Sequence, residues 1–102
     1  MTLITKYPYE EHFRYHQFRR ADGSGWLGSI ETLTGTPAVT VKEVSSGVDR
    51  TPEMISNVAV YDTTQVIYFL KGGTANTLYI ITIQVVSSEG QKFEDHLELK
   101  VL

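Results

Sequence analysis

Hydrophobic and polar positions alternate along two long stretches in the C-terminal half of the chain, "LYIITIQVVSS" (78–88) and "KFEDHLELKVL" (92–102). One face collects the apolar residues Tyr79, Ile81, Ile83 and Val85 in the first stretch, and Phe93, Leu97, Leu99 and Val101 in the second. A period of two with β-branched and aromatic enrichment indicates β-strands. The polar connection "SSEGQ", which contains Gly90, is short. The pattern therefore predicts a long antiparallel hairpin.

Shorter apolar stretches upstream predict further strands. They are "SIETL" (29–33), "AVTVKEV" (38–44), "ISNVAVY" (55–61) and "QVIYFL" (65–70). The turn "GTP" precedes the second stretch, and the polar "DTT" joins the last two. Gly, Pro and Ser residues mark 45–54 as a loop.

The first twenty residues allow two interpretations. Phe13 and Tyr15 alternate as in a strand, whereas Tyr9, Phe13 and His16 would share one stripe of a helix. We favour a strand over about 11–19 with its aromatic side chains packed inward, because every other predicted element is β. Residues 1–10 contain Pro8 and show no pairing pattern, so they are expected to form an N-terminal arm that can order against a neighbour.

About seven short strands, with turns spaced at 8–12 residues, are typical of a small β-sandwich or barrel. No amphipathic stretch of 10–15 residues is present, which argues against a parallel sheet with crossover helices. The expected fold class is therefore all-β.

Composition and charge argue against several classes of function. The 102 residues fit one domain, the net charge is −3, and there is no cysteine to form a disulfide, a thiolate metal site or a nucleophile. An acidic chain has no overall positive field to attract nucleic acid. No apolar run approaches the roughly 18 residues of a membrane span, and the N-terminus lacks the apolar core of a signal peptide. We expect neither nucleic acid nor a membrane as partner.

The segment "LKGGTANTLY" (70–79) superficially resembles a strand leading into a phosphate-binding loop. Such a loop places its lysine after the second glycine and continues into a helix. Here Lys71 precedes both glycines and a strand follows. Gly72 or Gly73 is therefore expected to take positive φ and redirect the chain between strands. Tyr79 then either hydrogen-bonds back to the preceding loop, as at the corner of immunoglobulin-like sandwiches, or simply packs in the core.

No constellation of residues indicates catalysis, a cofactor or a metal. His12 and His16 would share one face of a strand at a distance of about 13 Å, too far apart to hold one ion. The carboxylates of "EDHLE" (94–98) occupy one strand rather than two sides of a cleft. The mixed aromatic and basic stretch "HFRYHQFRR" can mark a single-strand nucleic-acid surface, but acidic residues flank it.

The order of several segments carries a family resemblance. The aromatic stretch "HFRYHQF" precedes Trp26-Leu27 and Ile30, then come "AVTV", "GGTANTLY", "ITIQVVSSEGQ" and "HLELKV". From about Phe13 onward the chain resembles the small immunoglobulin-like proteins of tailed-phage and prophage structural modules, described as fiber-tail adaptors or related neck and tail components. It departs from them at Asn76, where glycine is common, at Gln91, where arginine is common, and in the longer "RRADGSG" segment.

The resemblance implies a single immunoglobulin-like β-sandwich of about seven antiparallel strands over residues 11–102. It further implies a non-enzymatic virion protein, synthesised in the bacterial host cytoplasm, that binds other tail or neck proteins and works as a homo-oligomer or ring. The aromatic residues Phe13, Tyr15 and Trp26 are then core or interface residues, with Tyr7 and Tyr9 as further contact residues. Gly72, Gly73, Tyr79 and Gly90 are turn or corner residues.

A second function class stays open from the sequence, a carbohydrate- or surface-binding immunoglobulin-like module. Such a module would need a cluster of exposed aromatic side chains on one sheet face and usually an export signal, which this N-terminus lacks. A chain that begins with Met and has 102 residues is also expected to be a whole small protein rather than a detached module.

Overall fold

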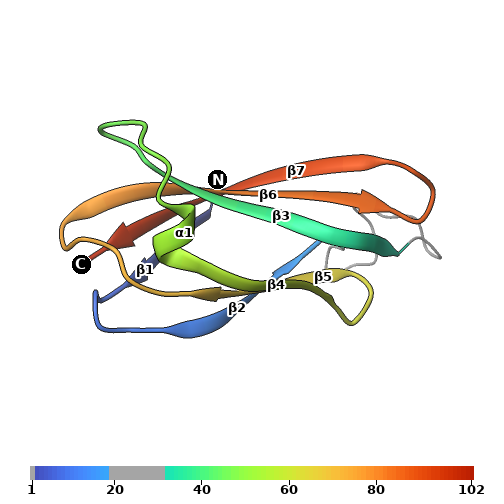
Figure 1. Ribbon diagram of the computed structural model, residues 1–102, viewed down its shortest axis with the longest axis horizontal. Coiled ribbons are helices and arrows are strands. Elements are labelled where there is room, and N and C mark those ends of the chain that lie inside the picture. The colour runs from blue at the N-terminus through green and yellow to red at the C-terminus, as the bar shows by residue number, and fades with distance from the viewer. Residues whose placement is uncertain (1, 19–31) are drawn as a thin grey trace.

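The computed structural model describes residues 2–18 and 32–102, which form seven strands and one short helix (Figure 1). The elements are β1 (Thr2–Lys6), β2 (His12–Gln17), β3 (Leu33–Glu43), α1 (Thr51–Met54), β4 (Ile55–Tyr61), β5 (Gln65–Leu70), β6 (Thr77–Ser87) and β7 (Lys92–Val101). One sheet has four strands in the order β1-β7-β6-β3, and the other has three in the order β2-β5-β4. The two sheets form two layers, so the predicted all-β, sandwich-like class is confirmed. Its immunoglobulin-like type stays a prediction.

The predicted hairpin is confirmed. β6 and β7 pair antiparallel from Thr77 opposite Val101 to Val86 opposite Lys92, and Gly90 in their turn has φ 80°. The predicted strands 55–61 and 65–70 are β4 and β5, which pair antiparallel across a tight turn. Period-two patterning specified these elements because a shift of one residue would turn every apolar side chain toward water.

The core lies between the two sheets and consists mainly of aliphatic side chains. All of the inward apolar positions predicted in the hairpin are buried except Phe93, which packs partly buried against the core. From the opposite sheet, Val66, Tyr68 and Leu70 of β5 are at most 1% exposed. Each such side chain stabilises the fold by about 1.5–3 kcal/mol relative to an exposed one. This packing holds the outer faces of both sheets in fixed shapes.

The N-terminal residues differ from the expected arm. Residues 2–6 form β1, which runs parallel to β7 from Thr2 opposite Leu97 to Lys6 opposite Val101. The strands are therefore not all antiparallel. Parallel partners need a long connection, and here almost the whole chain lies between them. The alternation in β1 is short and ends on a charged residue, so the sequence pattern did not predict this strand.

Two further local features differ from the sequence-based expectations. The "GTP" turn lies inside β3, where it shifts the register with β6 between Thr34 and Ala38. The predicted loop 45–54 contains the one-turn helix α1, with Pro52 in its first turn. Residues 29–31 of the predicted strand 29–33 lie outside the described residues, and Leu33 begins β3. In the described part of the chain, no helix is long and apolar enough to cross a membrane.

Candidate protein interface

The outer face of the three-stranded sheet carries aromatic and uncharged side chains. Alternation along β2 and β5 turns Phe13 and Tyr15 outward beside their partners Phe69 and Ile67. Tyr61 of β4 lies on the same face, opposite Gln65 of β5. We call this surface the aromatic face, and it comprises Phe13, Tyr15, Gln17, Ala59, Tyr61, Gln65, Ile67 and Phe69.

Three rings of the aromatic face remain about half exposed. Phe13, Tyr15 and Tyr61 keep 48%, 54% and 48% of their surface accessible. Since a large aromatic side chain presents about 200 Å², these three rings alone expose roughly 300 Å². An apolar patch of this order is comparable to the largest patch on a typical monomer, and such patches are often functional.

The rings of the aromatic face pack against one another in edge-to-face pairs. The centroids of Phe13 and Phe69 are 4.9 Å apart with an interplanar angle of 69°, and those of Tyr15 and Tyr61 are 5.0 Å apart at 64°. This is the favoured geometry for paired aromatic quadrupoles. The pairs link β2 to β5 and β2 to β4, so the rings on this face hold one another in place.

The prediction that the aromatic side chains of residues 11–19 pack inward is wrong for Phe13 and Tyr15. The inner positions of β2 belong instead to polar side chains, among them Arg14 and His16. Arg14 hydrogen-bonds Tyr68, and burial raises the pKa of that phenol. The edge strand thus turns its polar residues toward neighbours inside the sandwich. Trp26, the third predicted core or interface aromatic, lies outside the described residues.

His16 joins the two sheets. Its Nε2 lies 2.8 Å from Oδ2 of Asp95 on β7, and the His16 side chain is 14% exposed. Burial lowers the pKa of His16, while the neighbouring Asp95 carboxylate acts in the opposite direction. The imidazole ring also lies edge-to-face with Phe18, at a centroid distance of 4.9 Å. This cross-sheet contact fixes β2 relative to β7.

The glycine pair forms the corner between β5 and β6. Gly72 and Gly73 have φ 65° and 95°, a region that L-residues with a side chain rarely adopt. A Cβ at Gly73 would lie 2.8 Å from Cγ2 of Val101, and one at Gly72 would lie 3.2 Å from the Glu53 carbonyl oxygen. The corner therefore needs glycine both for its backbone conformation and for its close approach to neighbours.

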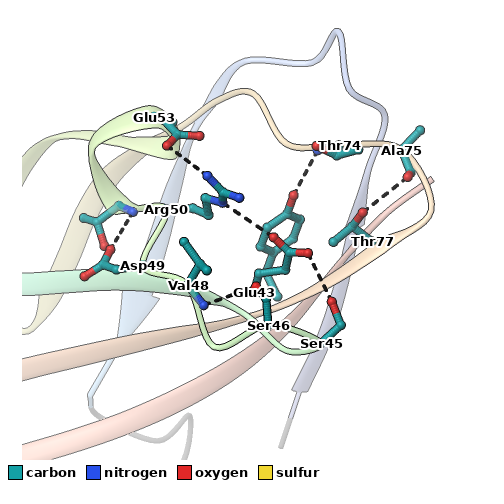
Figure 2. Close-up of polar contacts among 12 residues, drawn as sticks. Glu43, Ser45, Ser46, Val48, Asp49, Arg50, Glu53, Thr74, Ala75 and Thr77 are labelled. Carbon is teal, nitrogen blue, oxygen red and sulfur yellow. Dashed lines mark hydrogen bonds and ion pairs between the residues drawn. The ribbon is translucent and has the colours of Figure 1, made fainter.

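Tyr79 and Lys6 hold this corner from two sides. The Thr74 N–H donates a hydrogen bond of 3.0 Å to the Tyr79 hydroxyl (Figure 2), although Tyr79 is also a core residue with 2% exposure. Tyr79 is thus both a core residue and the residue whose hydroxyl hydrogen-bonds to the preceding loop. Lys6 Nζ donates hydrogen bonds to the carbonyls of Gly72 and Tyr7. Burial lowers the pKa of Lys6, and the nearby Glu10 and Glu11 act in the opposite direction.

A polar cluster lies at the same end of the sandwich, where α1 approaches β3 (Figure 2). Arg50 lies between Glu43 and Glu53, with N···O distances of 3.5 Å to each. Hydrogen bonds from the Thr51 side chain and from the Thr51 N–H lower the pKa of Asp49. These ion pairs lie near the surface, with side-chain exposures of 22% for Glu43, 39% for Arg50 and 64% for Glu53, so they contribute little to stability.

Within residues 2–18 and 32–102, no group of three or more His, Asp or Glu side chains could hold a metal ion. His96 Nε2 contacts Glu94 at 2.8 Å on the outer face of the four-stranded sheet, whereas His16 contacts Asp95 between the sheets. His16 and His96 are therefore engaged in separate pair contacts. The aromatic face instead offers exposed apolar area for contact with another molecule.

Comparison with known proteins gives one family. A family model described as "Podophage GP4 fiber-tail adaptor protein gp77" matches residues 18–100, which includes the glycine corner and the long hairpin. No curated protein and no solved structure gives a significant match. The matched region begins just after β2, so it covers part of the aromatic face.

Proposed function

The chain belongs to the podophage fiber-tail adaptor family, and from this membership we propose that it joins tail proteins in the virion, with its aromatic face as one of its contact surfaces. An adaptor of this family is a structural component of the virion. Its work is to bind neighbouring proteins, and we propose that it does so without catalysis. The observation that carries the proposal is the family match over residues 18–100.

The aromatic face supports the mode of binding. Aromatic side chains contribute much of the energy at the centres of protein interfaces, because they bury a large rigid surface with few rotatable bonds. Phe13, Tyr15 and Tyr61 are half exposed and held by ring contacts, so they would lose little conformational entropy on binding.

A second candidate function, carbohydrate binding, is favoured by the same exposed rings. A sugar-binding sheet face needs aromatic rings that lie flat, so that pyranose rings can stack on them. Here the paired rings are inclined at 69° and 64°, so the two rings of each pair cannot form one level platform. The geometry therefore favours an interdigitating protein partner.

The experiment is a deletion of the gene in its phage, followed by electron microscopy and mass spectrometry of the particles. We expect wild-type particles to contain the protein, and deletion particles to keep filled heads but to lack fibers. Supply of the wild-type gene in trans should restore them. Purified virions that lack the protein, or deletion particles with normal fibers, would refute the adaptor function.

A glycan array tests the second candidate function, carbohydrate binding. Binding of the isolated protein to a defined sugar, lost on Tyr15→Ala and kept on Tyr9→Ala, would support carbohydrate recognition. We expect no binding that depends on Tyr15.

A further inference from the structure

The aromatic face differs in charge from the β7 side of the four-stranded sheet. Among its described residues there is no Asp, Glu, Lys or Arg. The outer face of the four-stranded sheet, by contrast, carries a charged row on β7, with Lys92, Glu94, Glu98 and Lys100 all outward. The ends of the sandwich add acidic groups such as Glu43 and Glu53.

This distribution matters for contacts between copies of the chain. Each copy has a net charge of −3, so two copies repel one another at long range. A contact between copies costs least where neither surface carries a charge that must be desolvated or that faces its own duplicate. The aromatic face is such a surface, and it is apolar as well.

We propose that the aromatic face binds a second copy of this chain, face to face about a two-fold axis. The inference rests on the proposed function, for which it names the first partner. In a two-fold contact the same surface serves both copies, so the uncharged face meets its own duplicate without like-charge repulsion. The inclined ring pairs give the face ridges that interdigitate, as side chains do between packed sheets about 10 Å apart.

The area of the aromatic face sets the strength of this contact. The three half-exposed rings supply roughly 300 Å², and the remaining residues of the face bring this to roughly 500 Å² per copy. Two copies would then bury on the order of 1,000 Å², which is the lower limit for a specific interface. An interface of this size is at the weak end of specific protein contacts.

A two-fold contact is closed after two copies and leaves other surfaces free. The charged outer face of the four-stranded sheet and the polar cluster around Arg50 remain exposed in such a dimer. These surfaces are available to other tail proteins. The dimer is thus the building unit of the adaptor layer, and its formation precedes contact with fibers.

Sedimentation velocity of the whole chain, from about 5 to 500 μM, tests the proposal. We expect the average mass to rise from that of the 11.5 kDa monomer toward twice that value. Tyr15→Glu places like charges across the two-fold contact and should weaken association at least tenfold. The matched control is Tyr9→Glu, since Tyr9 is 95% exposed and lies outside the aromatic face. Added salt should leave wild-type association unchanged or strengthen it, because it screens the repulsion between acidic chains.

A measurement without substitution guards against a variant that fails to fold. Backbone amide NMR shifts of the wild-type chain are recorded while it is diluted, and the changes should concentrate on β2, β4 and β5. A wild-type chain that stays monomeric to 500 μM would overturn the proposal, as would dilution shifts confined to the four-stranded sheet. Equal association of Tyr15→Glu and Tyr9→Glu would also overturn it. Loss of dimerisation with normal fiber attachment would refute this inference and leave the adaptor function standing.

Discussion

At the scale of single residues, the corner between β5 and β6 depends on one hydroxyl and one missing side chain. The buried Tyr79 accepts a hydrogen bond from the Thr74 N–H at its hydroxyl, and this bond is partly buried. Gly73 allows the loop to touch Val101, the last residue of β7. Both residues act on the same junction, so each can be tested by its effect on stability.

Tyr79→Phe should lower the free energy of unfolding by about 0.5–1.5 kcal/mol, because the Thr74 N–H loses its acceptor within the protein. Urea denaturation measures this change. Tyr61→Phe removes the same hydroxyl from a half-exposed ring and should change stability by less than about 0.5 kcal/mol. Equal effects of the two substitutions would show that the corner hydrogen bond contributes nothing specific.

Gly73→Ala should destabilise the protein by about 2–4 kcal/mol, since the new methyl group meets Val101 in addition to the strain of positive φ. Gly90→Ala is the matched control, because Gly90 has φ 80° and a Cβ there would meet no atom within 4 Å. The control should cost only about 1–2 kcal/mol. Thermal melts of both variants give the comparison, and a control as damaging as Gly73→Ala would contradict the steric account.

At the scale of elements, β2 is attached to the rest of the sandwich by two kinds of contact. Its backbone pairs with β5, and His16 reaches across to Asp95 on β7. The burial that lowers the pKa of His16 means that the folded protein binds this proton less readily than the unfolded chain. Stability is therefore full above the ordinary histidine pKa of 6.5 and falls as the pH drops through and below that value.

His16→Gln should reduce this loss of stability between about pH 6.5 and 5, since the titrating group is removed. Chemical denaturation across that range measures the slope. In the wild-type protein, an NMR titration should place the His16 pKa below 6.5. Asp95→Asn should lower it further, because the opposing carboxylate charge is lost. A His16 pKa above 6.5 would reverse the sign and contradict the account.

The elements also show which parts of the fold were predictable from sequence. β6 and β7 were predictable because long alternation fixes both strand type and facing. β1 was not, since Thr2–Lys6 is short, ends on an inward lysine and pairs with the far end of the chain. The facing of β2 was predicted wrongly, because Phe13 and Tyr15 alternate with His and Arg and either set could face the core. The polar set faces inward because His16 contacts Asp95 and Arg14 hydrogen-bonds Tyr68. Both partners lie far along the sequence.

At the scale of the whole molecule, the two sheets present different surfaces. The four-stranded sheet has a charged outer face, and the three-stranded sheet has the uncharged aromatic face. Sequence predicted that Tyr15 and Phe13 belong to a core or an interface, but the aromatic face also needs Tyr61, Ile67 and Phe69. These residues come from β4 and β5, and no spacing in the sequence shows that they meet β2. The aromatic face forms because the strand order of this sheet places β5 between β2 and β4.

The most direct test of the central claim is photo-crosslinking inside the virion. A phage whose adaptor carries p-benzoylphenylalanine in place of Tyr15 is assembled, purified, irradiated and digested for mass spectrometry. We predict crosslinks from position 15 to β2, β4 or β5 of a second copy, whereas the same substitution for Gln84, on the opposite outer face, should not give them. Particles that contain the substituted protein, yet yield no protein crosslink from position 15, would contradict the role of the aromatic face.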